Sequence, residues 1–310
     1  MIDLPDNPYW FINHGLVFKS PFLLHGVEPI APQSAFDVEI SFGDTPAYLE
    51  NAQITDDCYE VAADKILYAD PAIGRFVVEN GNKIVIEVTG VRNLDVLISY
   101  VNASGVGALL HQRRQFPLHG SCVARDGAAF MFCGDSGAGK STTAAYFLGK
   151  GFELVCDDVV TVDFNTDENP LVVPSNRSPK IWNETISELA LAESTNLSVK
   201  EYEGTAKNVL HLNSSLSSSG KTSKLKAIYM LRWNFPTGAE ARISSFSGLE
   251  SMHYLKANAF RGSLIEALGN QEVFFEWSSR LIKCVKCASL ARGRETRSLV
   301  EVEQLILADA

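Results

Sequence analysis

Apolar and polar positions alternate over short runs in the first 90 residues. The runs are separated by Gly, Asn, Asp and Pro, and one break, Asn80 to Lys83, has the composition of a hairpin connection. A two-residue period is typical of β-strands with one buried face. The pattern therefore predicts a β-rich N-terminal domain over residues 1–90, and no residues in it have a catalytic spacing. The strand candidates are FDVEISF, KILYA, GRFVVENG and NKIVIEVTG.

The period changes between Asn93 and Arg113, where apolar residues recur at helical spacing. Gly105 and Gly107 are weak points of this predicted helix, because glycine costs backbone entropy in a helix. We place the domain boundary near residue 90 and assign residues 91–310 to a second domain. The apolar positions of the helix are Leu94, Leu97, Ile98, Val101, Leu109 and Leu110.

Predicted strands and helices alternate in the second domain. GSCVARDGAAFMFC predicts two strands around an Asp126-Gly127 turn, and TTAAYFLGKG predicts a helix that ends at Gly151. FELVCDDVVTVDF and KAIYMLRW predict further strands, residues 212–224 a Ser-rich surface loop, and residues 245–290 a mainly helical segment. The expected fold class is α/β.

Composition narrows the classes of partner. Hydrophobic residues make up 46% and charged residues 21%, and the formal net charge is −10, which argues against broad binding of nucleic acid. No secretory signal is visible, and no apolar stretch approaches the roughly 20 residues that cross a bilayer. Three of the six cysteines, Cys122, Cys133 and Cys156, lie in apolar runs, which suggests buried, reduced thiols. We therefore expect a cytoplasmic protein with no nucleic-acid or membrane partner. Whether it forms a homo-oligomer stays open.

One glycine-rich segment carries a complete phosphate-binding pattern, G-x-x-x-x-G-K-[ST], between a predicted strand and a predicted helix. Its glycines would let successive N–H groups converge on phosphate oxygens. Lys140 would reach the β- and γ-phosphates, and the Ser141 hydroxyl would bind Mg²⁺. The sequence thus predicts an ATP and Mg²⁺ site whose nucleotide-binding residues are Gly134, Asp135, Ser136, Gly137, Ala138, Gly139, Lys140, Ser141 and Thr142.

Two adjacent acids, Asp157 and Asp158, follow soon after the loop. They could be a turn cap and a surface charge. Alternatively, one carboxylate holds the magnesium while the other faces the acceptor and takes its proton, a division of roles that phosphoryl transfer to a hydroxyl requires. An ATPase that hydrolyses water more often uses one acid for the metal. The second acid therefore favours a kinase.

The segment PLHGSCVARDGAAFMFCGDSGAGKSTTAAYFLGKGFELVCDDVV resembles the catalytic core of the HPr kinase/phosphorylase family. It is closest to stand-alone relatives found with peptide-modifying gene clusters, such as lasso-peptide serine kinases. The shared features are the His-Gly before the first strand, the loop ending in GAGKST, the short helix and the early Asp-Asp pair. Weaker similarity extends over YWFINHGLVFKSPFLL, LLHQRRQFPLHGS and SPKIWNE.

The resemblance implies a P-loop core related to phosphoenolpyruvate carboxykinase, with ATP, Mg²⁺ and a serine hydroxyl as acceptor. By the same resemblance, Asp157 matches the general base, Asp158 its metal-side neighbour, and His119 a residue near the transferred phosphate. His119 could also be a satisfied histidine at a strand start. A glycine-rich segment after the core, which HPr kinases use for HPr docking and phosphorolysis, has no counterpart here, so HPr itself is not the expected acceptor.

Phosphoryl transfer usually needs a further cation over the developing charge. Arg177, with Lys180 as an alternative on the same Pro-bounded loop, and Arg261 are the candidates, and each could equally be a surface charge. Arg113 and Arg114 could steer an acidic acceptor or could end a solvated helix.

The leading hypothesis is an ATP-dependent serine kinase that acts on a peptide or protein, for example a ribosomally made peptide precursor. The alternatives are a kinase of free serine or another small hydroxyl compound, and a regulatory ATPase that uses nucleotide to switch conformation.

Overall fold

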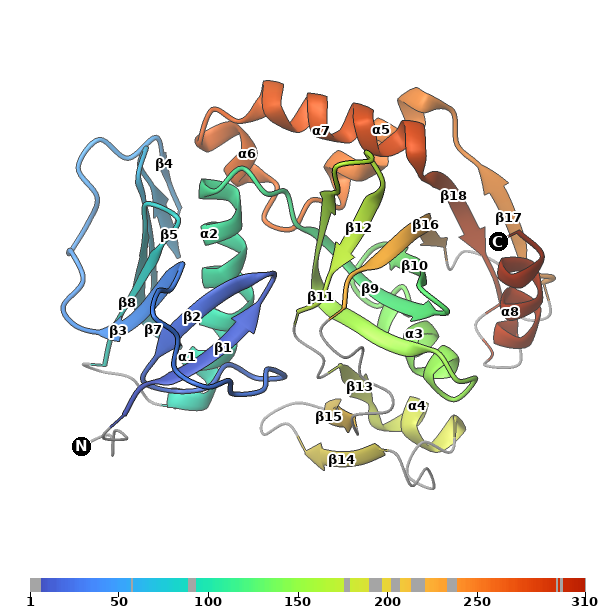
Figure 1. Ribbon diagram of the computed structural model, residues 1–310, viewed down its shortest axis with the longest axis horizontal. Coiled ribbons are helices and arrows are strands. Elements are labelled where there is room, and N and C mark those ends of the chain that lie inside the picture. Colours follow the sequence, from blue (N-terminus) through green and yellow to red (C-terminus); the bar gives the residue numbers. More distant parts are fainter. Residues whose placement is uncertain are drawn as a thin grey trace. The chain divides into compact units, whose positions relative to one another are not determined.

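The protein folds into two compact units (Figure 1). Unit 1 comprises residues 1–117 and 260–276, and unit 2 comprises residues 118–259 and 277–310. The computed structural model describes residues 7–56, 58–88, 93–175, 179–189, 197–201, 207–212, 221–232, 239–293, 295 and 298–309.

An eight-stranded sheet forms most of unit 1, in the order β1-β2-β3-β8-β7-β6-β5-β4. The β2–β3 and β3–β8 pairs are parallel and the other pairs are antiparallel. Asn80 and Gly81 have φ of 52° and 65° between β7 and β8, so the predicted hairpin turn is confirmed. The strands are β1 (Tyr9–Asn13), β2 (Leu16–Ser20), β3 (Val38–Phe42), β4 (Ile54–Thr55), β5 (Tyr59–Val61), β6 (Lys65–Asp70), β7 (Gly74–Glu79) and β8 (Lys83–Glu87).

One continuous helical run follows the sheet: α1 (Leu94–Tyr100), the π-helical turn η1 (Val101–Gly105) and α2 (Val106–Gln112). It begins at Asn93, whose side chain caps the first turn. Of the described residues, this 19-residue run alone is long and apolar enough to cross a membrane, but 72% of its 18-residue apolar window is buried inside the protein, as in the core helix of a folded domain.

The unit boundary lies later in the chain than residue 90, and the predicted division into residues 1–90 and 91–310 is corrected accordingly. A side chain at Gly105 would lie 3.3 Å from the Phe76 ring, which shows how closely the helical run approaches the sheet of unit 1. Helix α6 (Ser263–Ala267) and the first turns of α7 (Gln271–Cys284) also belong to unit 1. Tertiary packing, rather than the change of period, decides where the first unit ends.

A seven-stranded mixed sheet forms the centre of unit 2, in the order β10-β9-β11-β12-β16-β18-β17. Strands β10, β16 and β18 run parallel, and pairing between β10 and β16 closes a ring through β9, β11 and β12. A smaller sheet has the order β13-β15-β14. The strands are β9 (Leu118–Arg125), β10 (Ala128–Cys133), β11 (Glu153–Phe164), β12 (Pro170–Val173), β13 (Lys180–Trp182), β14 (Leu197–Glu201), β15 (Lys207–Leu212), β16 (Ser223–Arg232), β17 (Arg242–Ser245) and β18 (Lys286–Ala291).

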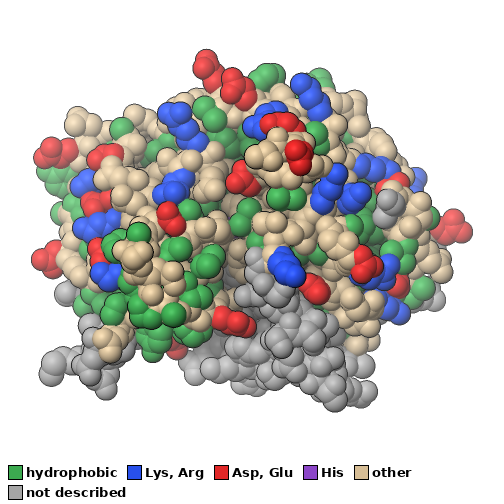
Figure 2. Space-filling model, viewed as in Figure 1, with side chains coloured by type: hydrophobic (Ala, Val, Ile, Leu, Met, Phe, Trp, Pro, Cys, Tyr) green, Lys and Arg blue, Asp and Glu red, His purple; other side chains and the backbone are tan. Residues whose placement is uncertain are grey.

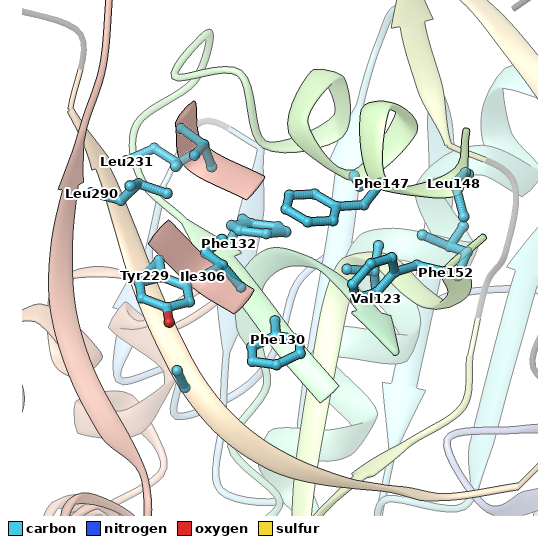
Figure 3. Close-up of a cluster of buried hydrophobic side chains, with 14 of the residues drawn as sticks. Val123, Phe130, Phe132, Phe147, Leu148, Phe152, Tyr229, Leu231, Leu290 and Ile306 are labelled. Carbon is cyan, nitrogen blue, oxygen red and sulfur yellow. The ribbon is translucent and has the colours of Figure 1, made fainter. Parts of the chain in front are cut away.

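A hydrophobic core joins this sheet to two helices of unit 2, α3 and α8 (Figure 3). Phe132 of β10 stacks on Phe147 of α3 at 5.6 Å between ring centroids and lies 6.2 Å from Tyr229 of β16. Ile306 of α8 belongs to the same cluster. The core therefore fixes α3 directly behind the glycine-rich loop. The helices of unit 2, besides the rest of α7, are α3 (Lys140–Leu148), α4 (Asn183–Glu188), α5 (Gly248–Ala257) and α8 (Ser298–Asp309).

Several local predictions in unit 2 are confirmed. Asp126 and Gly127 have φ of 53° and 77° in the turn between β9 and β10, and Gly151, at 81°, follows the end of α3. The three cysteines in apolar runs are buried free thiols. The segment 245–290 is less helical than predicted, because its last residues join the parallel sheet as β18. Within the predicted Ser-rich loop, residues 213–220 lie outside the described part of the chain.

The architecture is thus a mixed α/β fold with two larger mixed sheets, in agreement with the predicted class. The relation of its core to phosphoenolpyruvate carboxykinase stays a prediction. Acidic and basic side chains are interspersed over the face shown in Figure 2.

Candidate functional site

The glycine-rich loop connects the end of β10 to the start of α3. Gly134, Gly137 and Gly139 have φ of 138°, 81° and 86°, conformations that favour glycine. A side chain at Gly134 would lie 3.0 Å from the Leu231 carbonyl oxygen, whereas a side chain at Gly137 would meet nothing within 4 Å. Close packing therefore requires glycine at the first position, and the backbone conformation requires it at the others.

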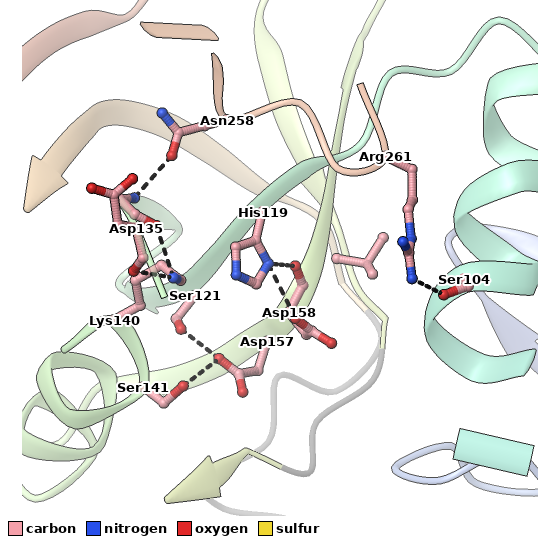
Figure 4. Close-up of polar contacts among 12 residues, drawn as sticks. Ser104, His119, Ser121, Asp135, Lys140, Ser141, Asp157, Asp158, Asn258 and Arg261 are labelled. Carbon is pink, nitrogen blue, oxygen red and sulfur yellow. Dashed lines mark hydrogen bonds and ion pairs between the residues drawn. The ribbon is translucent and has the colours of Figure 1, made fainter. Parts of the chain in front are cut away.

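Lys140, the first residue of α3, turns its side chain back over the loop (Figure 4). Its Nζ donates hydrogen bonds to the carbonyl oxygens of Gly134 at 2.8 Å and Asp135 at 3.0 Å. Only 8% of the residue is exposed, and burial lowers the pKa of its ammonium group. The loop thus holds a poorly solvated ammonium group whose two described hydrogen-bond acceptors are backbone carbonyl oxygens.

Ser141 and Asp157 bring the loop and the acidic pair together. Ser141 Oγ donates to Asp157 Oδ1 at 3.4 Å, and Ser121 Oγ of β9 donates to the same carboxylate oxygen (Figure 4). Ser121 faces Asp157 because these two residues are register partners in the β9–β11 pair. The acidic pair thus lies in the middle of β11, beside the first turn of α3.

Asp158 departs from regular strand geometry, with φ of 73°. A strictly alternating strand would direct its side chain away from the face that carries Asp157. Instead its carboxylate Oδ1 lies 3.1 Å from His119 Nδ1, and its backbone carbonyl oxygen lies 3.1 Å from the same nitrogen. Strained backbone of this kind costs about 1–3 kcal/mol and is concentrated at functional sites. The distortion brings both aspartates and His119 into one cluster.

The two carboxylates differ in their surroundings. Asp157 is only 6% exposed, whereas the side chain of Asp158 is 43% exposed. Burial raises the pKa of Asp157 above its ordinary range; the Ser121 hydrogen bond opposes this shift, and the neighbouring Asp158 charge adds to it. A bound cation would reverse the shift by favouring the ionised carboxylate.

The chemistry of these oxygen donors fits Mg²⁺, which prefers carboxylate and hydroxyl oxygens and one or two protein carboxylates beside substrate phosphates. Ser141 Oγ and Asp157 Oδ1 are already close enough to contact one ion. Asp158 stands next in the strand with a more exposed carboxylate.

Two residues of the site carry no signal in the sequence. Ser121 is recognisable only from the register of β9 and β11. Asn258, at the end of α5, accepts a hydrogen bond from the Gly134 N–H through Oδ1 at 3.0 Å, and its own carbonyl accepts from the His119 N–H at 2.7 Å. Asn258 therefore links the start of the glycine loop to the strand that carries His119.

A role for the predicted additional cations at this cluster stays a prediction. Arg177 lies outside the described residues, and the backbone of Lys180 lies in β13. Arg261 belongs to unit 1, where its Nη2 donates to Ser104 Oγ at 2.7 Å. Arg113 also belongs to unit 1 and donates to the Gly81 carbonyl oxygen at 3.0 Å.

No protein-family model matches the chain, and no curated protein matches its sequence. Among solved structures, it is similar to the Hpr(Ser) kinase/phosphatase from Coxiella burnetii at 11% identity and a TM-score of 0.33, over 62% of this chain and 95% of that chain. A similarity at this level amounts to a distant structural relation and assigns no activity.

Proposed function

We propose that this chain is an ATP-dependent kinase whose acceptor is a serine hydroxyl of a peptide or protein. The observation that carries the proposal is the contact between Ser141 and Asp157. It joins a loop suited to a triphosphate directly to an adjacent pair of acids, and transfer to a hydroxyl requires both.

The loop would bind the phosphates of ATP through its N–H groups and the N-terminus of α3. Lys140 would release the carbonyl oxygens of Gly134 and Asp135 and bind phosphate oxygens instead. Its buried position supports this role, because a poorly solvated ammonium group gains more from a phosphate partner than a solvated one. Ser141 and Asp157 would hold Mg²⁺, and the ion, when bound, would neutralise charge on the phosphates.

Asp158 and His119 would face the acceptor. The more exposed Asp158 carboxylate is the one that an incoming hydroxyl can reach, and the His119 contact fixes its orientation. In the proposed step the serine oxygen bonds to the γ-phosphorus, the bond from phosphorus to the β,γ-bridging oxygen breaks, and Asp158 accepts the serine proton. The products are phosphoserine and ADP. This order of roles is the reverse of the one implied by the family resemblance, and the Ser141–Asp157 contact supports it.

The test is ATP turnover with and without an acceptor. The purified protein is incubated with Mg²⁺, ATP labelled in the γ-phosphate and a library of serine-containing peptides, in parallel with alanine-substituted peptides and free serine. Label transferred to the serine peptides supports the proposal. Label on free serine alone would indicate a small-molecule kinase, and phosphate release that no acceptor accelerates would indicate a regulatory ATPase.

A further inference from the structure

A cavity of about 960 Å³ lies in unit 2 against the glycine-rich loop, and neither residue of the acidic pair lines it. Gly134 to Ala138 form one end of its lining. The other walls are the ends of β16 and β18, the strand β17 and one side of α5. His119, Ser141, Asp157 and Asp158 are not among its lining residues.

A stacked aromatic pair lines this cavity. Phe246, just after β17, and Tyr254 of α5 have ring centroids 4.4 Å apart and an interplanar angle of 18°. Both rings are half-buried, so part of their surface is accessible from the cavity. An accessible aromatic surface of this kind is suited to stacking on a planar base.

Charged and polar groups surround the ring pair. Arg232, the last residue of β16, lies with its guanidinium 5.3 Å from the Tyr254 centroid and 6.0 Å from that of Phe246, and its Nη2 donates to the Tyr254 hydroxyl. Arg242, Ser244, Ser245 and Glu250 also line the cavity. The walls thus combine a stacking surface with hydrogen-bond donors and acceptors, as small-ligand sites generally do.

The cavity also lies where the parallel strands end. β10, β16 and β18 are parallel neighbours, and their carboxyl ends supply the loop, Arg232 and Ala291 respectively. Ligands of α/β folds commonly bind outside the carboxyl ends of parallel strands. A triphosphate on the loop with its terminal phosphate near Asp157 would direct its other end into this cavity.

We propose that this cavity binds the nucleoside of the triphosphate, with the base stacked on the Phe246–Tyr254 pair. The inference rests on the proposed nucleotide-dependent function. It assigns substrate recognition to Arg232 and to residues 242–258, which no motif in the sequence identifies.

The test compares ATP with inorganic tripolyphosphate, which carries the phosphate chain without the nucleoside. Affinities of both are measured by calorimetry, with Mg²⁺, for the full-length protein and for the double variant Phe246→Leu/Tyr254→Leu. We expect ATP to bind roughly 5- to 150-fold more weakly to the variant, as for the loss of one base–aromatic stack. Tripolyphosphate affinity should stay unchanged.

Three further variants make the test decisive. Tyr254→Phe keeps the stack and should bind ATP nearly as well as the wild type. Leu249→Ala, on the same helix, changes a side chain that is 83% exposed and outside the cavity lining, and should change neither affinity. Ser245→Trp fills the cavity from an exposed position and should weaken ATP alone, even if the double leucine variant fails to fold.

Unchanged ATP affinity in folded Ser245→Trp and double leucine variants would overturn the nucleoside site, and so would an equal loss for ATP and tripolyphosphate. ATP binding that depends on the cavity, in a protein that phosphorylates no hydroxyl, would support the site while overturning the kinase proposal. A wild-type protein that binds neither probe would overturn both.

Discussion

Ser141 Oγ donates a hydrogen bond to Asp157 Oδ1 at 3.4 Å, which links the first turn of α3 to the middle of β11. The two residues come from elements that are joined by a short connection and packed on one core. Because of this contact, a group held by the loop would also lie beside the acidic pair.

Replacing Lys140 should weaken nucleotide binding. In Lys140→Ala, we expect ATP affinity to fall about 10- to 100-fold, because charge-assisted hydrogen bonds to phosphate are lost. Calorimetric titration with ATP measures the change. Lys150→Ala is the matched control, since Lys150 follows the same helix and contacts Tyr146 and Glu303 instead of the loop. Equal affinity in the wild type and Lys140→Ala would remove Lys140 from the site.

Substitutions of Asp157 and Asp158 should affect different kinetic quantities, because one residue is proposed to hold Mg²⁺ and the other to accept the proton. Asp157→Asn should raise the Mg²⁺ concentration needed for half-maximal activity about 10- to 100-fold, because a metal-side charge is lost. Asp158→Asn should leave that concentration unchanged and lower kcat about 10²- to 10⁴-fold, because a proton acceptor is lost. Steady-state kinetics over a range of Mg²⁺ concentrations measures both quantities.

Asp163→Asn, an exposed position on the same strand, is the control for the two aspartate variants and should behave as the wild type. The opposite assignment of effects to Asp157 and Asp158 would restore the order of roles that the family resemblance implies.

Stability should depend on pH through Asp157. Burial raises the pKa of this carboxyl in the folded protein, so the folded state binds more protons than the unfolded state between about pH 4, the ordinary range for Asp, and the raised value. The contribution of Asp157 to stability is therefore complete below pH 4 and is lost as the pH rises through the raised pKa.

Asp157→Asn removes this titration. The free energy of unfolding of the variant, minus that of the wild type, should therefore increase as the pH is raised from 4 to 8, as measured by urea denaturation without Mg²⁺. Asp163→Asn should show a constant difference over this range. A constant difference for Asp157→Asn as well would contradict the raised pKa.

Replacing a glycine of the loop should affect ATP binding, whereas replacing a glycine of similar conformation elsewhere should affect stability alone. Gly137→Ala and Gly151→Ala both place a side chain in open space at φ of 81°, and each should lower the free energy of unfolding by about 1–2 kcal/mol. Only Gly137→Ala should also weaken ATP binding. Gly134→Ala should be the most destabilising, because its added carbon would lie against the Leu231 carbonyl oxygen. Thermal melts and ATP titrations of the three variants test these expectations.

Local features of the fold followed from the sequence where the backbone conformation has a local cause. The Asp126-Gly127 turn and Gly151 after α3 require positive φ, which Asp and Gly tolerate. The 94–112 helix followed from the period of its apolar residues. The residue at which unit 1 ends could not be predicted from the sequence. It depends on tertiary contacts such as the close approach of Gly105 to Phe76.

Some residues of the candidate site could likewise be identified from the sequence, and others could not. The glycine-rich loop, Lys140, Ser141 and the acidic pair were recognisable because their spacing is contiguous and their chemistry is specific. Ser121 and Asn258 were not recognisable, since the first depends on strand register and the second on where a distant helix ends. Arg261 was a candidate cation by residue type alone, and its described polar partner is Ser104 of unit 1.

The sequence by itself therefore determined the order of strand, glycine loop, helix and acidic strand, because each is set by local conformation and residue type. Tertiary structure alone decided which of the two acids meets Ser141, and it turned Asp158 towards His119 through a left-handed residue in a strand. The physical reason is that side-chain direction depends on strand register and on one distorted dihedral angle, and packing with neighbouring strands sets both.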